Sequence, residues 1–390
     1  MSVTVDQDQA LIDDVRWVAE EVAAKHADSV DRDARFPEET IAALRERQAL
    51  SAFVPRELGG AGVSFEALAS ACYELGRRCG ASAMVFAMHQ IQVATIVRHL
   101  DDAPWFEEYL RELVAEQRLI ASVTSEVGTG GDMGRSIASV EPSGDGTGRF
   151  EKQAPTVSYG AHADDLLTTL RRSPEAEPGD QVCVLTRKDQ HTLEPTGSWD
   201  PLGMRGTCSP GNVVRAEFPL EQVLPTQFAA VMNESMVPIS HILWSHLWLG
   251  IATDAFDRAR TFVRAAAKRK PGEQPPTALR LSVLMSELSL LRAEVYSGLR
   301  EFVEASADDR ARLSEMATIL RFNNLKIAAS EQAPRVCQGA LGVCGIVGFK
   351  NDTPFSVGRH LRDTMSACLM VANERIHQTN ASLLLIAKEV

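Results

Sequence analysis

The spacing of apolar residues predicts helices over the first third of the chain. Four apolar residues recur at intervals of three and four and so share one helix face: Leu11, Val15, Val18 and Val22. The glycines of "LGGAG" at 58–62 indicate a turn, and Ser64 is the expected N-cap of the long apolar helical pattern that follows. We therefore predict an N-terminal helical domain over residues 1–118.

The pattern changes near residue 119 to short β-branched segments separated by Gly, Pro, Asp and Ser. In "VVRAEF", for example, Val214, Ala216 and Phe218 alternate with more polar positions, as in a half-buried strand. Because no helical segments stand between these strands, the pattern favours a β-sandwich or barrel over a parallel α/β sheet. Residues 119–228 are predicted to form a middle β-domain.

Helical patterning returns from residue 229 and continues to residue 390. It predicts four long helices, at about 237–268, 277–305, 309–337 and 357–389. The fold class is therefore mixed α and β, mostly α, in the order helical domain, β-domain, helical domain.

Composition narrows the classes of function. A chain of 390 residues with 45% hydrophobic residues can bury more than one core. Its net charge of -12 argues against nucleic acid or an anionic membrane as a partner. The seven cysteines form no CxxC pair and show no zinc-ligand spacing, which predicts free thiols and no metal site. With no signal-peptide pattern at the start, a cytoplasmic location is expected.

Two glycine-rich segments are candidates for binding a cofactor. The segment "SEVGTGGD" at 125–132 matches neither GxGxxG nor the P-loop signature. Its glycines nevertheless allow the backbone to approach a phosphate or a flavin ring closely. The second segment, "QGALGVCG" at 338–345, reads by itself as a helix end followed by a turn.

Taken together, these segments resemble the acyl-CoA dehydrogenase family of flavoenzymes. The resemblance covers essentially the whole chain and rests on five segments in the family's order: "LGGAG", "SEVGTGGD", "LGMRGT" at 202–207 after Trp199, the Gln-plus-glycine segment, and Arg362-Asp363. It implies a four-helix bundle at the C-terminus and FAD held between that bundle and the β-domain. It also implies a homodimer or homotetramer, since in the family a neighbouring subunit completes the FAD site.

The resemblance also assigns site residues. Those implied for the cofactor are Val123, Thr124, Ser125, Gly130, Gly131, Thr156, Ser158, Gln338 and Gly342. The last two correspond to the part of the family's site that faces the adenosine diphosphate of FAD. The family's RKxFG motif is absent, and "AAAKRKPGEQPP" at 265–276 offers Lys268 or Arg269 in its place.

The catalytic base is the main departure. In the family a glutamate removes the α-proton of an acyl thioester while a hydride passes to flavin N5. Counting from Arg362-Asp363 puts that glutamate on Val371, and the alternative seat used by isovaleryl-type members falls on Ser240. Glu374 is the candidate base. The other interpretation is that Glu374 is an exposed residue at a helix start. Glu234 and His241 are weaker candidates.

Three hypotheses of function follow. The leading one is an FAD-dependent dehydrogenase that desaturates an acyl thioester of CoA or a carrier protein and passes electrons to an electron-transfer flavoprotein. The alternative is a flavin-dependent monooxygenase on the same fold, supplied by a flavin reductase, which needs no carboxylate. The third is a non-catalytic family member, because a fold does not dictate function.

Overall fold

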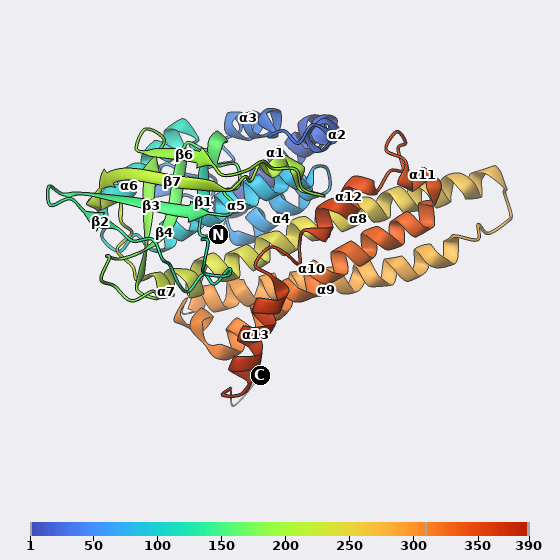
Figure 1. Ribbon diagram of the computed structural model, residues 1–390. Helices are drawn as coiled ribbons and strands as arrows, with labels where there is room; N and C mark the ends of the chain where they lie inside the picture. The colour runs from blue at the N-terminus through green and yellow to red at the C-terminus, as the bar shows by residue number, and fades with distance from the viewer. Residues whose placement is uncertain (1, 309, 388–390) are drawn as a thin grey trace.

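The structure is a computed structural model that describes residues 2–308 and 310–387, and Figure 1 shows helices, then strands, then helices along the chain. The N-terminal helices are α1 (Ser2–Val18), α2 (Ala24–Arg32), α3 (Glu38–Glu46), α4 (Phe65–Gly76), α5 (Gly80–Arg98) and α6 (Pro104–Glu116). Ser64 caps α4 as predicted, because its Oγ accepts a hydrogen bond from the Ala67 N–H at 3.1 Å.

Helix α5 is the central helix of this first region. By length and composition it is the one described helix that could cross a membrane, yet 89% of its most apolar window is buried inside the fold. His89 on α5 contributes to this packing, since its Nε2 lies 2.8 Å from the Leu50 carbonyl and its Nδ1 accepts from the Ile120 N–H at 3.0 Å. Burial lowers the pKa of His89 to about 4, which identifies it as a neutral core histidine.

The β-domain contains two sheets. Strands β1 (Ile120–Val123), β4 (Asp165–Arg171) and β5 (Gln181–Arg187) form one sheet in the order β1-β4-β5. Strands β2 (Glu141–Pro142), β3 (Thr147–Ala154), β7 (Asn212–Pro219) and β6 (His191–Pro195) form the other in the order β2-β3-β7-β6. The alternation predicted for β7 is confirmed, because Val214, Ala216 and Phe218 are buried.

Two details of the β-domain differ from the sequence expectation. Strands β1 and β4 are parallel although no helix longer than one turn joins them. The connection runs through β2 and β3 of the second sheet, which supplies the long crossover that a parallel pair needs. The sequence pattern also predicts a short strand over "TVSYG" at 156–160, but this segment is a turn, because Tyr159 has a φ of 43° and donates its N–H to the Thr207 carbonyl at 2.7 Å.

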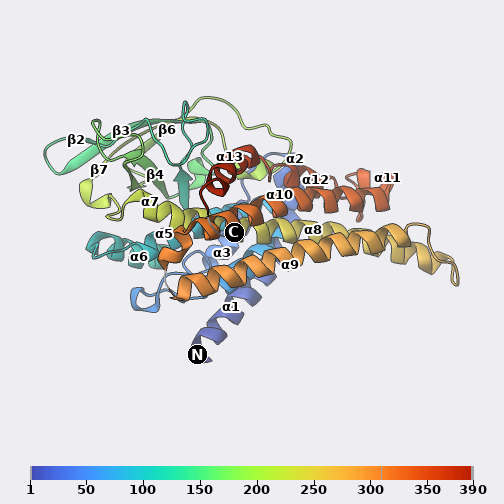
Figure 2. The ribbon, with the colours of Figure 1, turned by 90° about the horizontal axis from the view of Figure 1, so that it is seen from below.

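The C-terminal region contains α7 (Phe228–Val231), α8 (Val237–Arg269), α9 (Ala278–Asp308), α10 (Met316–Cys344), α11 (Ile346–Phe349), α12 (Gly358–Met365) and α13 (Asn373–Leu384). Figures 1 and 2 show α8, α9 and α10 running side by side in a bundle that extends away from the β-domain. Helices α4 and α8 cross closely at two glycines, since a Cβ on Gly76 would lie 2.4 Å from the Leu247 carbonyl oxygen and one on Gly250 would lie 2.3 Å from that of Tyr73.

The predicted last helix at 357–389 is wrong as a single element. It is two helices, α12 and α13, separated by a turn, and Val371 in that turn has a φ of 45° that a helix cannot continue through. We call residues 366–373 the C-terminal corner. Helix α10 runs further than predicted, to Cys344. The predicted helix boundaries at 309 and 389 fall on residues outside the described ranges.

The "LGMRGT" and Arg362-Asp363 motifs meet in space. Asp363 Oδ1 accepts a hydrogen bond from the Met204 N–H at 2.8 Å, and a Cβ on Gly203 would lie only 2.0 Å from the Arg362 carbonyl oxygen. Glycine is therefore required at position 203 for the loop to reach α12. This contact ties the β-domain to the C-terminal corner that follows α12.

Candidate functional site

Three hydroxyl side chains follow the ends of β1 and β3. Ser125 Oγ donates to the Thr156 carbonyl at 2.8 Å and lies 3.3 Å from Thr156 Oγ1. Ser158 Oγ accepts from Ser209 Oγ at 2.9 Å. Thr156 is exposed, and Ser125 and Ser158 are half-buried. We call Ser125, Thr156 and Ser158 the hydroxyl shelf, which presents polar groups at an accessible edge of the β-domain.

The shelf is supported from behind by residues that sequence reasoning did not single out. Thr207 Oγ1 lies 2.9 Å from Ser209 Oγ, so hydroxyls run in sequence from Thr207 through Ser209 to Ser158. The phenol hydroxyl of Tyr159 donates a hydrogen bond to the Ile120 carbonyl at 2.9 Å. The position of Thr207 and Ser209 could have pointed to them in the sequence, since Thr207 is the last residue of the "LGMRGT" motif and Ser209 follows two residues later.

The glycine loop at 126–138 is held by a buried carboxylate. Glu126 is 5% exposed and accepts from Ser136 Oγ at 2.7 Å, from the Ile137 N–H at 3.0 Å and from the Ala138 N–H at 2.6 Å. The buried ammonium of Lys152 lies 3.7 Å from Glu126 Oε2, and burial lowers the pKa of Lys152 to about 8. Because the carboxylate is saturated by these donors, Glu126 shapes the loop and is not free to act as a base.

The tip of the loop is open backbone. Gly128, Gly130 and Gly131 all have positive φ, at 93°, 60° and 82°. Within residues 2–308 and 310–387, the N–H groups of Gly130 and Gly131 have no hydrogen-bond acceptor. Arg375 from α13 donates to the carbonyls of Gly130 and Thr129 on the other side of the loop. Free N–H groups on positive-φ glycines suit an anion such as a phosphate, and the adjacent shelf suits the polar edge of a flavin ring.

The C-terminal corner directly precedes α13, whose Arg375 contacts the glycine loop. Polar groups of α10 hold this corner. Lys326 Nζ donates to the Val371 carbonyl at 3.0 Å and to Asn373 Oδ1 at 2.7 Å. Asn373 Nδ2 in turn donates to Ser330 Oγ at 3.1 Å. Among the described residues, the hydrogen-bonding side chains that meet the corner from α10 are an ammonium and a hydroxyl, and none is a carboxylate.

The candidate bases do not gather at the corner. Glu374 is exposed on the first turn of α13. Ser240 Oγ donates to the Val237 carbonyl at 2.8 Å within α8. His241 Nδ1 lies 3.1 Å from the Phe322 carbonyl, and burial lowers the pKa of His241 to about 3, so this ring is neutral. Glu234 is half-buried, and its backbone carbonyl accepts from Arg98.

The remaining predicted cofactor residues divide into two groups. Val123 is buried and Thr124 half-buried at the end of β1, next to the shelf. Gln338 and Gly342 are exposed, one turn apart near the C-terminal end of α10. Figure 1 shows that end of α10, beside α11, at the far end of the bundle from the strands. A single chain therefore does not bring Gln338 and Gly342 together with the shelf.

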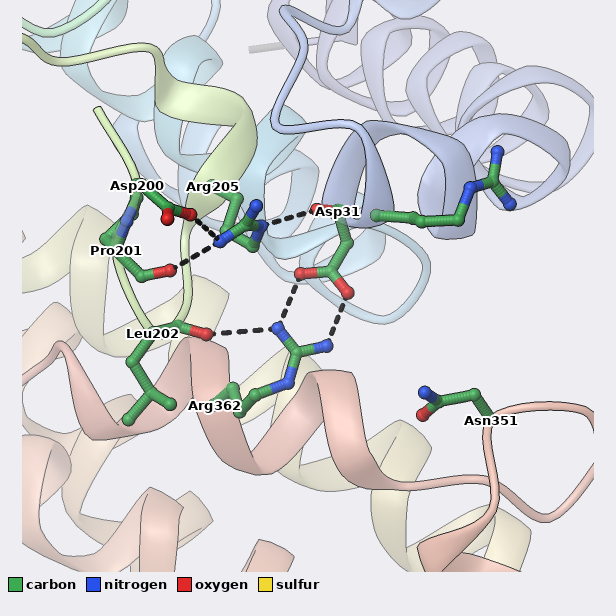
Figure 3. A pocket seen from close by; sticks show the side chains of 8 residues that line it. Asp31, Asp200, Pro201, Leu202, Arg205, Asn351 and Arg362 are labelled. Carbon is green, nitrogen blue, oxygen red and sulfur yellow. Dashed lines mark hydrogen bonds and ion pairs between the residues drawn. The ribbon is translucent and has the colours of Figure 1, made fainter. Parts of the chain in front are cut away.

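A surface pocket of about 460 Å³ lies elsewhere, between α2, the loop before "GMRGT" and α12 (Figure 3). Its centre is Asp31, whose carboxylate pairs with Arg362 and whose carbonyl accepts from Arg205 at 2.8 Å. Arg205 also pairs with Asp200 at 2.6 Å. Both guanidinium groups are already paired with carboxylates. These contacts connect α2, the loop before "GMRGT" and α12. No described group of three or more His, Cys, Asp or Glu side chains could hold a metal ion.

Comparison with known proteins agrees with this architecture. Residues 5–117 match the family model for the acyl-CoA dehydrogenase N-terminal domain. Cyclohexane-1-carbonyl-CoA dehydrogenase of Geobacter metallireducens is 24% identical over 397 residues, covering 99% of this chain and 98% of that protein. Dibenzothiophene monooxygenase of Mycolicibacterium goodii is 28% identical over 235 residues, covering 58% of this chain and 56% of that protein.

Among solved structures, KijD3 in complex with FMN and dTDP-3-amino-2,3,6-trideoxy-4-keto-3-methyl-D-glucose shares the fold. The two chains align with a TM-score of 0.83 at 23% identity, over 98% of this chain and 95% of that one. The KijD3 structure holds FMN, and the shelf and open glycine loop of this chain fit a group of that kind. These comparisons support a flavin as the cofactor.

Proposed function

We propose that this chain, whose residues 5–117 match the acyl-CoA dehydrogenase N-terminal domain, is a member of that family and a flavin-dependent oxidoreductase of the monooxygenase type. It would bind a flavin reduced by a separate reductase and use molecular oxygen to oxygenate a small organic substrate. The observation that supports the proposal is the C-terminal corner: the resemblance puts the family's glutamate on Val371, and the structure has a buried Lys326 whose Nζ donates to the Val371 carbonyl.

The two reactions make opposite demands on this corner. Desaturation requires a carboxylate that removes a proton from carbon, and such a base works best with a raised pKa in a buried setting. A reduced flavin, when bound, supplies the electrons that place one oxygen atom on the substrate and the other in water. That reaction needs a water-excluding wall beside the flavin, and an aliphatic side chain such as Val371 provides one.

The residues of the chain have separable tasks in this proposal. The hydroxyl shelf binds and orients the polar edge of the flavin ring, and the N–H groups of Gly130 and Gly131 bind its phosphate. Arg375 keeps the loop tip beside α13. The corner closes the opposite side and excludes water.

The substrate class draws support from the relatives. Their names describe an aromatic sulfur heterocycle and an amino sugar nucleotide as molecules acted on or bound. We propose that the substrate is a small molecule with an oxidisable sulfur, nitrogen or activated carbon, and that the reaction takes place in the cytoplasm.

The test supplies the purified protein with FMN or FAD, a flavin reductase, NADH and ¹⁸O₂. Dibenzothiophene, an amino sugar nucleotide and a set of acyl-CoAs serve as substrates, and mass spectrometry follows the products. Incorporation of one ¹⁸O atom into any substrate supports the proposal. A product that has lost two hydrogens with no ¹⁸O, formed from an acyl-CoA, would contradict it.

The second candidate function is acyl-thioester desaturation. It is favoured by the match to cyclohexane-1-carbonyl-CoA dehydrogenase over 99% of this chain. Glu374 is then the base to test, with an electron-transfer flavoprotein as the electron acceptor. Bleaching of the oxidised flavin by an acyl-CoA without oxygen, lost in Glu374→Gln, would establish this function over the first.

We also propose a homodimer or homotetramer. Gln338 and Gly342 are exposed and lie far from the shelf of their own chain, so they can reach a flavin only in a neighbouring copy. Light scattering coupled to size-exclusion chromatography measures the assembly. Loss of flavin affinity in Gln338→Ala without loss of assembly would support the shared site.

A further inference from the structure

Lys326 is a buried lysine directly beneath the C-terminal corner. Its side chain is fully buried, and its Nζ lies 3.0 Å from the Val371 carbonyl oxygen and 2.7 Å from Asn373 Oδ1. Both acceptors are neutral. In the described residues no carboxylate forms an ion pair with Lys326. The hydrogen bonds of this ammonium therefore go to a carbonyl and an amide, while the charge of Glu331 acts on it without an ion pair.

The hydrogen bonds of Lys326 hold the C-terminal corner in a strained backbone conformation. Val371 is β-branched and has a φ of 45°, a conformation that such residues rarely adopt. Strain of this kind persists only where the surroundings impose it. Here Lys326 holds the Val371 carbonyl, and the Asn373 N–H donates to the Cys368 carbonyl at 3.0 Å across the turn. The corner is thus fixed at its strained residue and at its end.

Retaining a charge here is expensive. A buried ammonium without a charged partner usually destabilises a fold, and an apolar side chain of similar volume would be cheaper. Burial accordingly lowers the pKa of Lys326 to about 8. The titratable groups that act on it are His241 on α8, Glu331 on α10 and Cys368 in the corner. His241 is neutral, and Glu331 pairs with Arg335 at 3.5 Å.

We propose that Lys326 is a positioning residue that fixes the C-terminal corner against the flavin site and makes that wall electropositive. A positive wall favours a flavin that carries negative charge, which is the reduced form, whereas a carboxylate at the same corner would disfavour it. This inference rests on the proposed function and deepens it. An enzyme that receives reduced flavin from a partner must bind the reduced form selectively.

The experiment measures binding of oxidised and dithionite-reduced FMN and FAD, without oxygen, to the full chain at pH 7.5 and pH 9.5. We expect the wild type to bind the reduced form more tightly at pH 7.5 and to lose most of that preference at pH 9.5, where the ammonium has titrated. In Lys326→Met the preference should fall about tenfold at pH 7.5, equivalent to roughly 1.4 kcal/mol, and should no longer change with pH.

Two further variants separate charge from packing. Lys326→Arg keeps a positive charge at both pH values, so it should keep the preference at pH 9.5. Lys350→Met removes an exposed lysine that pairs with Asp352 at 3.5 Å in the same region of the chain, and it should behave as the wild type. The Lys326→Arg result also decides the matter if Lys326→Met does not fold.

A wild type whose preference for reduced flavin is the same at both pH values would overturn the inference. So would a folded Lys326→Met that keeps the wild-type preference. Binding of flavin needs neither substrate nor oxygen. A protein that shows the Lys326 effect but desaturates an acyl-CoA without incorporating ¹⁸O would therefore contradict the proposed function and leave this inference standing.

Discussion

The two walls of the candidate site each contain a buried charge, but they treat it differently. On the shelf side, Glu126 receives three hydrogen bonds and lies 3.7 Å from the ammonium of Lys152, so its charge is balanced. On the corner side, Lys326 has only neutral hydrogen-bond partners among the described residues. A buried charge that is paired with an opposite charge and hydrogen-bonded mainly stabilises local structure. A buried charge without an ion-pair partner changes the electrostatic potential of the site around it. The comparison indicates that Glu126 shapes the site and that Lys326 sets its electrostatics.

The largest expected effect comes from breaking the balanced charge. Glu126→Ala leaves the Ser136, Ile137 and Ala138 donors and the Lys152 ammonium without their acceptor, so the free energy of unfolding should fall by about 3–5 kcal/mol. Urea unfolding monitored by circular dichroism measures it. Glu151→Ala, an exposed glutamate on β3, is the control and should change stability little. Equal losses in the two variants would show that Glu126 does not organise the loop.

The contact between the two walls should depend on pH. Burial raises the pKa of Asp363 to about 6, against the opposing effect of Arg359. Because the folded pKa is above the unfolded one, this group's contribution to stability is fully present below about pH 4 and is lost as pH rises through about 6. The difference amounts to roughly 3 kcal/mol. In Asp363→Asn this part of the pH dependence should disappear.

The measurement is the free energy of unfolding of the wild type and of Asp363→Asn at several values between pH 4 and pH 8. Other acidic groups titrate in both proteins, so the difference between the two curves isolates Asp363. A difference that stays constant across this range would contradict the pKa shift.

A substitution at the tip of the glycine loop should have a smaller effect on the shelf side of the site. Gly130 has a φ of 60°, and an added Cβ would lie 2.8 Å from Arg375 Nη2. Gly130→Ala should therefore cost about 1–2 kcal/mol of left-handed strain and also displace Arg375, weakening flavin binding. Gly144→Ala, with a φ of 80° and no atom within 4 Å, carries the strain without the contact. Flavin titrations should show weaker binding only in the Gly130 variant, and unchanged binding in both would count against the loop as part of the site.

The smallest effect is expected at Glu374. This residue is exposed at the start of α13, and surface substitutions usually change stability by less than about 0.5 kcal/mol. Glu374→Gln should leave both flavin binding and oxygenation within about twofold of the wild type, equivalent to less than roughly 0.5 kcal/mol. Steady-state rates measure it. A loss of activity at unchanged flavin affinity would return Glu374 to the role of base.

Much of the fold could be predicted because its signals are local. The helical spacing around Val15, the N-cap at Ser64 and the alternation in β7 each depend on residues a few positions apart. The resemblance also assigned Ser125, Thr156 and Ser158 to the site, and the structure has these residues just after the ends of β1 and β3. Thr207 and Ser209 were missed, since their part in the site is a contact between segments about 50 residues apart.

The break between α12 and α13 shows the limit of local signals. The sequence around Val371 is compatible with a helix, and nothing in its neighbours along the chain predicts a φ of 45° there. In the folded chain Lys326, 45 residues earlier, donates a hydrogen bond to the Val371 carbonyl. A hydrogen bond of this kind has no periodicity, so only the folded structure reveals it.

The sequence by itself therefore predicted the order of helical, strand and helical regions and the resemblance to the acyl-CoA dehydrogenase family, since these depend on residue identity and local spacing. The tertiary structure decided which buried charge is balanced and which is not, because charge compensation depends on distances between groups remote in the chain. It also separated Gln338 and Gly342 from the shelf, because a long helix carries them to the far end of the bundle.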